Sequence, residues 1–144
     1  MHEILHAVID TNHIMSAILS SRGASAKLVD WMTREEGCFR LLISQPIWNE
    51  YQTVANWLIP ESRQLEKERI LNAIRFQAKW IAPAMQLTVC RDLSDNRFLE
   101  CAVAGGAKYL VTKNIHHFPH KEYRGVKIVR ISKFLEALEK IARQ

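Results

Sequence analysis

Apolar strand patterns and amphipathic helix patterns alternate along almost all of the 144 residues. Short β-branched or apolar runs predict buried strands at 4–9, 40–44, 87–90, 108–112 and 126–131. The segments between and after them predict helices at 13–19, 24–36, 46–58, 61–81, 95–105 and 132–142. Strands that alternate with helices are typical of a parallel sheet covered on both faces. We therefore expect one α/β domain spanning residues 1–144.

The composition favours a globular protein with a polyanionic partner. Hydrophobic residues make up 48% of the chain, and no apolar run reaches the ~18–20 residues of a membrane helix. The net charge of +5 and the pI near 9.3 fit a nucleic-acid partner. The three cysteines lack the paired spacing of a zinc site, and residues 1–10 lack the features of a signal peptide. We expect a cytoplasmic protein with reduced thiols and no membrane contact.

Ligands of parallel α/β sheets bind at the carboxyl ends of the strands, and this rule selects among the fifteen acidic residues. Asp10 directly follows the first apolar strand and therefore lies at that edge. The alternative role of Asp10 is helix capping, which Thr11 or Asn12 would serve equally well.

The segment RDLSDNRFLECAVAGGA holds a second selected acid, Asp95. Helical spacing places Asp95 on the same face as Phe98, toward the sheet, and places Glu100 on the opposite face, toward water. Asp92 lies in the loop that enters this helix. Capping of the helix by Asp92, Asp95 or Ser94 is the alternative interpretation.

Glu50 is the third selected acid, because it falls inside the apolar arc of the helix PIWNEYQTVANWL. A carboxylate turned toward a core is costly unless it is paired or binds a metal. The alternative is a Glu50 that extends its carboxylate to solvent or forms a salt bridge. Asp10, Glu50 and Asp95 come from different elements but can converge at one sheet edge. Carboxylates ~4 Å apart repel by several kcal/mol, so such a cluster holds either protons or a hard cation such as Mg²⁺ or Mn²⁺.

Several motifs resemble the PIN domain, over nearly the whole chain and in the right order. They are VIDTN, the helical Glu50, RDLSDNRFLECAVAGGAKYLVT and GVKIVRISKFLEAL. The likeness is greatest to the toxin components of type II toxin–antitoxin systems. The resemblance implies a three-layer α/β/α fold with a parallel sheet in the strand order 3-2-1-4-5. It also implies a Mg²⁺- or Mn²⁺-dependent ribonuclease, often a homodimer, that a small antitoxin protein inhibits.

Carried over by motif, the resemblance makes Asp10, Glu50 and Asp95 the metal-binding and catalytic acids. Asp92 matches an accessory acid. Polar residues that line the family's site are matched by Asn12, Ser16, Thr112 and Asn114.

Asn114 is where the sequence departs from the family, because many PIN domains have an aspartate at this position. An amide can still bind a cation or orient water, but it adds no charge. Two consequences remain open: an active site that binds metal more weakly, or a degenerate PIN domain that binds RNA or a protein without cutting.

We expect the partner to be single-stranded RNA. Basic residues near these motifs are expected to contact its backbone: Lys113, Arg91, Arg97 and Arg22, with His116 and His117 at the rim of the site. A different class of function is a transition-metal protein that uses the HHFPH segment at 116–120.

Overall fold

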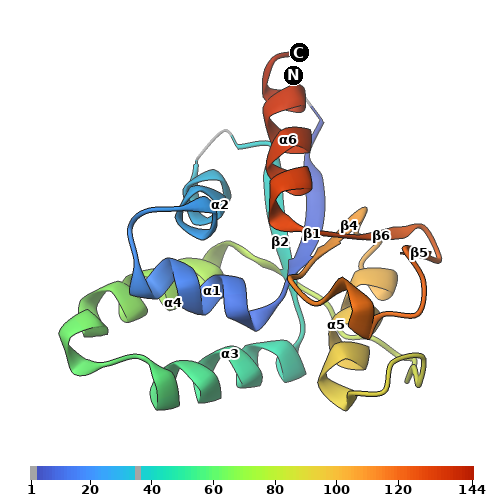
Figure 1. Ribbon diagram of the computed structural model, residues 1–144, viewed down its shortest axis with the longest axis horizontal. Coiled ribbons are helices and arrows are strands. Elements are labelled where there is room, and N and C mark those ends of the chain that lie inside the picture. Colours follow the sequence, from blue (N-terminus) through green and yellow to red (C-terminus); the bar gives the residue numbers. More distant parts are fainter. Residues whose placement is uncertain (1–2, 35–36) are drawn as a thin grey trace.

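The computed structural model describes residues 3–34 and 37–144 and contains a mostly parallel sheet (Figure 1). Its strands are β1 (Leu5–Ile9), β2 (Phe39–Ile43), β3 (Lys79–Trp80), β4 (Tyr109–Val111), β5 (Glu122–Tyr123) and β6 (Val126–Val129). They lie in the order β3-β2-β1-β4-β6-β5. The five parallel strands follow the expected order 3-2-1-4-5, and the short β5 adds an antiparallel edge beside β6.

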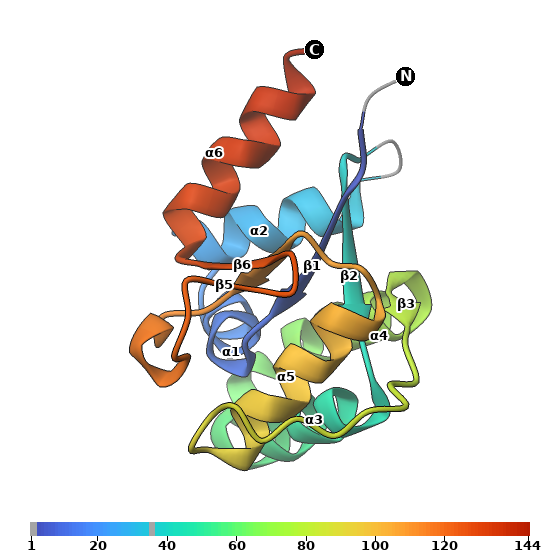
Figure 2. The ribbon, with the colours of Figure 1, turned by 90° about the vertical axis from the view of Figure 1, so that its right-hand side faces the viewer.

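Helices cover both faces of the sheet, as the three-layer prediction requires. They are α1 (Thr11–Leu19), α2 (Ala24–Thr33), α3 (Gln45–Leu58), α4 (Gln64–Gln77), α5 (Leu93–Ala104) and α6 (Ile131–Ala142), with the 3-10 turns η1 (Glu61–Arg63) and η2 (Ile115–His117). Figure 2 shows α1, α2 and α6 on one side of the sheet and α5 on the other. The helix α4 contacts α1, α2 and β2, and α3 packs against both α1 and α5. Within the described ranges, no helix is long and apolar enough to cross a membrane.

The central strand β1 is buried on both faces, which explains its apolar sequence LHAVI. Ala7 and Val8 face opposite sides of the sheet, and neither is exposed to solvent. In the strand register, Ile9 lies beside Val111, and Val111 lies beside Val129. The chain therefore leaves β1, β4 and β6 at the same level, and this shared edge positions the polar residues that follow each strand.

The predicted third strand at 87–90 is wrong. The strand that pairs with β2 is Lys79–Trp80, and residues 81–92 contain neither helix nor strand. Leu87 is buried because this loop packs against α5, where its backbone N–H donates to the Glu100 side chain at 2.6 Å. An apolar run buried by a loop has the same sequence pattern as a strand. The helix predicted at 61–81 ends at Gln77, and the one predicted at 24–36 ends at Thr33, with residues 35–36 outside the described part.

Candidate active site

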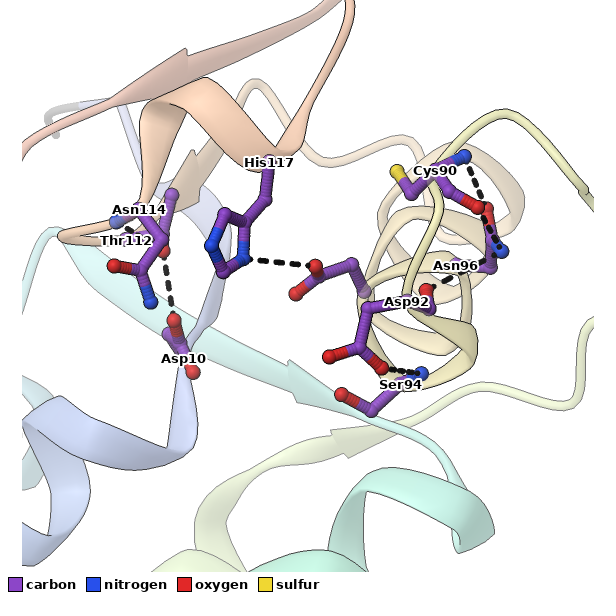
Figure 3. Close-up of polar contacts among 9 residues, drawn as sticks. Asp10, Cys90, Asp92, Ser94, Asn96, Thr112, Asn114 and His117 are labelled. Carbon is purple, nitrogen blue, oxygen red and sulfur yellow. Dashed lines mark hydrogen bonds and ion pairs between the residues drawn. The ribbon is translucent and has the colours of Figure 1, made fainter.

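Asp10 joins the ends of β1 and β4 through its side chain. It occupies the N-cap position of α1, but its carboxylate accepts no capping hydrogen bond. Instead, Oδ2 accepts a hydrogen bond of 2.7 Å from Oγ1 of Thr112, which follows β4 directly and is buried. The backbone N–H of Asn114 donates to the same hydroxyl at 3.0 Å (Figure 3). The side chain of Asp10 is therefore fixed by the sheet edge, and helix capping does not explain it.

Glu50 is held beside this edge by its neighbour Tyr51. The buried Tyr51 hydroxyl donates a 2.5 Å hydrogen bond to the carbonyl of Ile9, which attaches α3 to the end of β1. Glu50 is half-buried, and its Oε2 accepts a hydrogen bond from the Thr11 hydroxyl. Burial first, and then the negative charges of Asp10 and Glu50, hold the pKa of Tyr51 well above its ordinary value. Tyr51 therefore remains a hydrogen-bond donor at any physiological pH.

Asp95 is buried in the first turn of α5, as the helical spacing predicts. Its Oδ2 lies 3.1 Å from Nδ1 of His117, which projects from η2 across the sheet edge. In Figure 3 a dashed line joins the imidazole of His117 to this carboxylate. Burial, followed by the charge of Asp92, raises the pKa of Asp95, while His117 lowers it; Asp10 adds a smaller increase. Asp95 therefore senses the charge of Asp92, at the start of its own helix, and that of Asp10, at the end of β1.

Asp92 has the capping role that was the alternative for this acidic pair. Its Oδ1 accepts a 3.0 Å hydrogen bond from the backbone N–H of Ser94, at the start of α5. The loop before it is fixed by Asn96, whose amide exchanges hydrogen bonds of 2.8 and 3.0 Å with the backbone of Cys90. The cap leaves Asp92 exposed next to Asp95.

The other predicted site residues lie in four places. Asn12 is exposed on α1, whereas Ser16 lies in a surface depression together with Arg22 and Lys113. Asn114 is half-buried at the N-cap of η2, and His116 is exposed on the same turn. Two predicted RNA contacts lie near α5: Arg91 is exposed just before the helix, and Arg97 on the helix is ion-paired with Glu100.

Glu100 was predicted to face water, and this prediction is wrong. Only 4% of Glu100 is exposed, because the loop at 81–92 covers this face of α5. Its carboxylate accepts the Leu87 N–H and lies 3.3 Å from the Arg97 guanidinium. Glu100 therefore stabilises the loop, and Arg97 supports Glu100 through their ion pair.

The carboxylates fit a divalent cation by chemical type. In each of Asp10, Glu50 and Asp95, one oxygen accepts a protein hydrogen bond, and across residues 3–34 and 37–144 the second oxygen has no protein donor. All-carboxylate oxygen donors suit Mg²⁺ or Mn²⁺. Over the same residues, no group of three or more His, Cys, Asp or Glu side chains is close enough to hold an ion. The carboxylates are thus gathered at one edge without converging on one point.

Sequence reasoning missed two partners of these acids, Thr11 and His117. Thr11 was considered only as a cap, although its hydroxyl contacts Glu50 on another helix. His117 was placed at the rim, but it contacts Asp95, which lies 22 positions earlier in the chain. No local pattern indicates either contact, because both depend on how the elements pack.

Comparison with known proteins agrees with this architecture. A family profile described as the PIN domain matches residues 6–116. Among solved structures, VapBC2 from Rickettsia felis, crystallised bound to a DNA fragment from their promoter, matches with a TM-score of 0.56 and 15% sequence identity. The match covers 86% of this chain and 97% of that chain, and at this identity it shows the fold alone. No curated protein matches the sequence significantly.

Proposed function

The chain belongs to the PIN-domain family, and on that premise we propose that it is a divalent-metal-dependent ribonuclease that hydrolyses RNA phosphodiester bonds. PIN domains are generally nucleases, and they generally use divalent metal ions. The observation that carries the proposal is the gathering of Asp10, Glu50 and Asp95, from β1's end, α3 and α5, at one sheet edge. The net charge of +5 suits a polyanionic substrate.

In this proposal Asp10, Glu50 and Asp95 hold the cation, with Asp92 as an accessory acid. The bound Mg²⁺ or Mn²⁺ supplies an activated water and stabilises charge on the phosphoryl group. Thr112 holds the Asp10 carboxylate in place through its hydrogen bond. Tyr51 holds the backbone at the end of β1 through its hydrogen bond to Ile9. Asn12, Ser16 and Asn114 line the site, and Lys113 and Arg22 bind the RNA backbone.

A second candidate is a catalytically weak PIN-like module that binds RNA or a protein partner without cleavage. Asn114 favours it, because the amide supplies no charge where many PIN domains have an acid.

The resemblance to toxin components adds two further proposals about partners. A small antitoxin protein would inhibit the enzyme, and two copies of the chain would associate as a homodimer. The fold that the chain shares with VapBC2 is consistent with both. Co-purification with the product of a neighbouring gene and the mass of the purified protein in solution test them.

The test of the proposed function is cleavage of single-stranded RNA by wild-type protein, Asp10→Asn and Asp30→Asn. The Asp30 control removes an equal charge from an exposed position of α2. With Mg²⁺ or Mn²⁺ we expect wild type and Asp30→Asn to cut equally, and Asp10→Asn to be slower by roughly 100-fold or more. Equal rates for wild type and Asp10→Asn would refute the proposal, and RNA that is bound but never cut would favour the second candidate.

A further inference from the structure

Three hollows adjoin one another along the edge that carries the candidate site. The largest, about 630 Å³, lies between η2, β6 and the start of α6. It shares Arg130 with a second hollow of about 430 Å³. The second shares His13, Lys113 and Ile131 with a third of about 380 Å³, which reaches the start of α2. The shared lining residues make the three hollows neighbours, and we refer to the row that they form as the depression.

Positive charge follows this depression from end to end. Six cationic side chains line it, and we refer to them together as the cationic track: Arg22, Lys113, Lys121, Lys127, Arg130 and Lys133. Glu122 is the single acidic residue in the lining. Within the described part of the chain, none of the six cations forms a salt bridge. The third hollow also includes residues 23–25, where the first turn of α2 presents backbone N–H groups that favour an anion.

The cationic track passes directly beside the candidate acids. Lys113 follows Thr112, the residue that donates to Asp10. At the other side, His116 lines the largest hollow, while the next residue, His117, contacts Asp95. A polyanion that lies along the track therefore passes close to the residues that contact Asp10 and Asp95.

The largest hollow combines this charged rim with an apolar floor. Phe118, Ile128 and Val129 are buried beneath it, with Ile115 half-buried beside them. The imidazole of His120 stacks on the ring of Tyr123, with ring centroids 6.1 Å apart and an angle of 16° between the planes. A flat apolar group with an adjoining phosphate matches this chemistry. An unstacked base of a single strand is such a group, whereas the bases of a duplex are paired and covered.

We propose that the cationic track is the path of single-stranded RNA across the protein, with one unstacked base in the hollow above Phe118. The proposal rests on the proposed function and adds the surface over which its RNA substrate runs. It also places the RNA on the side of α2 and α6. Arg97 lies on the other side and is already paired with Glu100.

A matched pair of variants on α6 tests the track. Lys133 lines the largest hollow, and Lys140 lies two turns further along the same exposed face, outside all three hollows. Lys133→Glu and Lys140→Glu change the net charge equally. Arg22→Glu probes the far end of the track, and Lys133→Gln is a milder version that keeps the folded surface closer to wild type. All are made in the full chain with Asp10→Asn, in EDTA, so that RNA is bound but not cut.

The measurement is fluorescence anisotropy of labelled oligo(U) and oligo(A) at several salt concentrations. We expect Lys133→Glu and Arg22→Glu each to weaken binding of both RNAs by about tenfold and to reduce the salt slope by about 0.7, and Lys140→Glu to weaken it by about twofold or less. Lys133→Gln should fall between them. An RNA duplex of the same length should bind more weakly than the single strand.

Equal RNA affinities of the Lys133→Glu and Lys140→Glu proteins would overturn the track. The largest hollow would then suit an acidic segment of a partner protein better than RNA. Complete absence of RNA binding would overturn it as well. Cleavage by the same variants with Asp10 restored separates the two proposals. RNA cut with metal but without dependence on Lys133 or Arg22 contradicts the track alone. RNA bound through Lys133 and Arg22 but never cut supports the track and contradicts the ribonuclease.

Discussion

Nδ1 of His117 lies 3.1 Å from Oδ2 of Asp95, although the two residues are on different elements, η2 and α5. Because an ionised carboxylate only accepts hydrogen bonds, the imidazole is the donor. Half of the His117 side chain is exposed, whereas Asp95 is buried. The imidazole therefore lies between solvent and the carboxylate, close to the position where Asn114 replaces the family's acid. His117 restrains Asp95 and stabilises its ionised form.

Replacing His117 should change the pH dependence of RNA cleavage. His117 lowers the pKa of Asp95, so that His117→Ala should raise this pKa and move the acidic limb of the kcat/KM profile, which reports the free enzyme, to higher pH. The matched control is His116→Ala on the same turn, which has no contact with the acids within the described residues and should leave that limb in place. An unchanged limb in both variants would show that Asp95 does not govern it.

Asp95→Asn should stabilise the metal-free protein while it removes cleavage. Burial and then Asp92 raise the pKa of Asp95, which means that the folded state disfavours the ionised carboxylate relative to the unfolded state. This penalty is fully present above the folded-state pKa and disappears as the pH falls below the unfolded-state value. In EDTA at neutral pH, we expect Tm to rise by roughly 2 °C, and the gain to shrink in acid. A lower Tm at neutral pH would contradict this account.

Glu100→Ala should destabilise the fold, because it leaves the buried N–H of Leu87 without an acceptor. The expected loss in the free energy of unfolding is about 1–3 kcal/mol, measured by urea denaturation. Glu136→Ala, at an exposed position of α6, should cost less than about 0.5 kcal/mol. Similar losses at the two positions would mean that the loop at 81–92 does not depend on Glu100.

Asn114→Asp should restore a fourth acid and make the protein depend more on metal. Without a cation, the added carboxylate meets the charge of Asp10, so Tm should fall; with Mn²⁺, the gain in Tm should exceed that of wild type. Asn72→Asp, on the exposed face of α4, adds the same charge at a distance and should leave the Mn²⁺-induced gain unchanged. An equal gain in the two variants would exclude position 114 from the metal site.

The sequence was sufficient to predict the central strands and the acids that follow them. β1, β4 and β6 are fully or largely buried, so their apolar runs are unambiguous. Asp10 must lie at the end of β1, because it is the next residue in the chain. β3 has only two residues, both exposed, and therefore carries no apolar signal. The loop at 81–92 carries that signal instead, because it is buried against α5.

Side-chain partners that depend on packing could not be predicted in the same way. Glu100 faces away from the sheet, and helical periodicity predicts water there unless another segment covers it. The loop is that segment. The pairing of His117 with Asp95 depends likewise on how η2 lies across the end of α5, which no sequence pattern encodes.

The central claim is that Asp10, Glu50 and Asp95 bind one divalent cation. A crystal soaked in Mn²⁺ and measured for anomalous scattering tests it most directly, because the peak position identifies the ligands without an assay of activity. We predict a peak among these three carboxylates in wild-type protein and its loss in Asp10→Asn. A peak at His116 and His120 instead, or none beside Asp10, would contradict the claim.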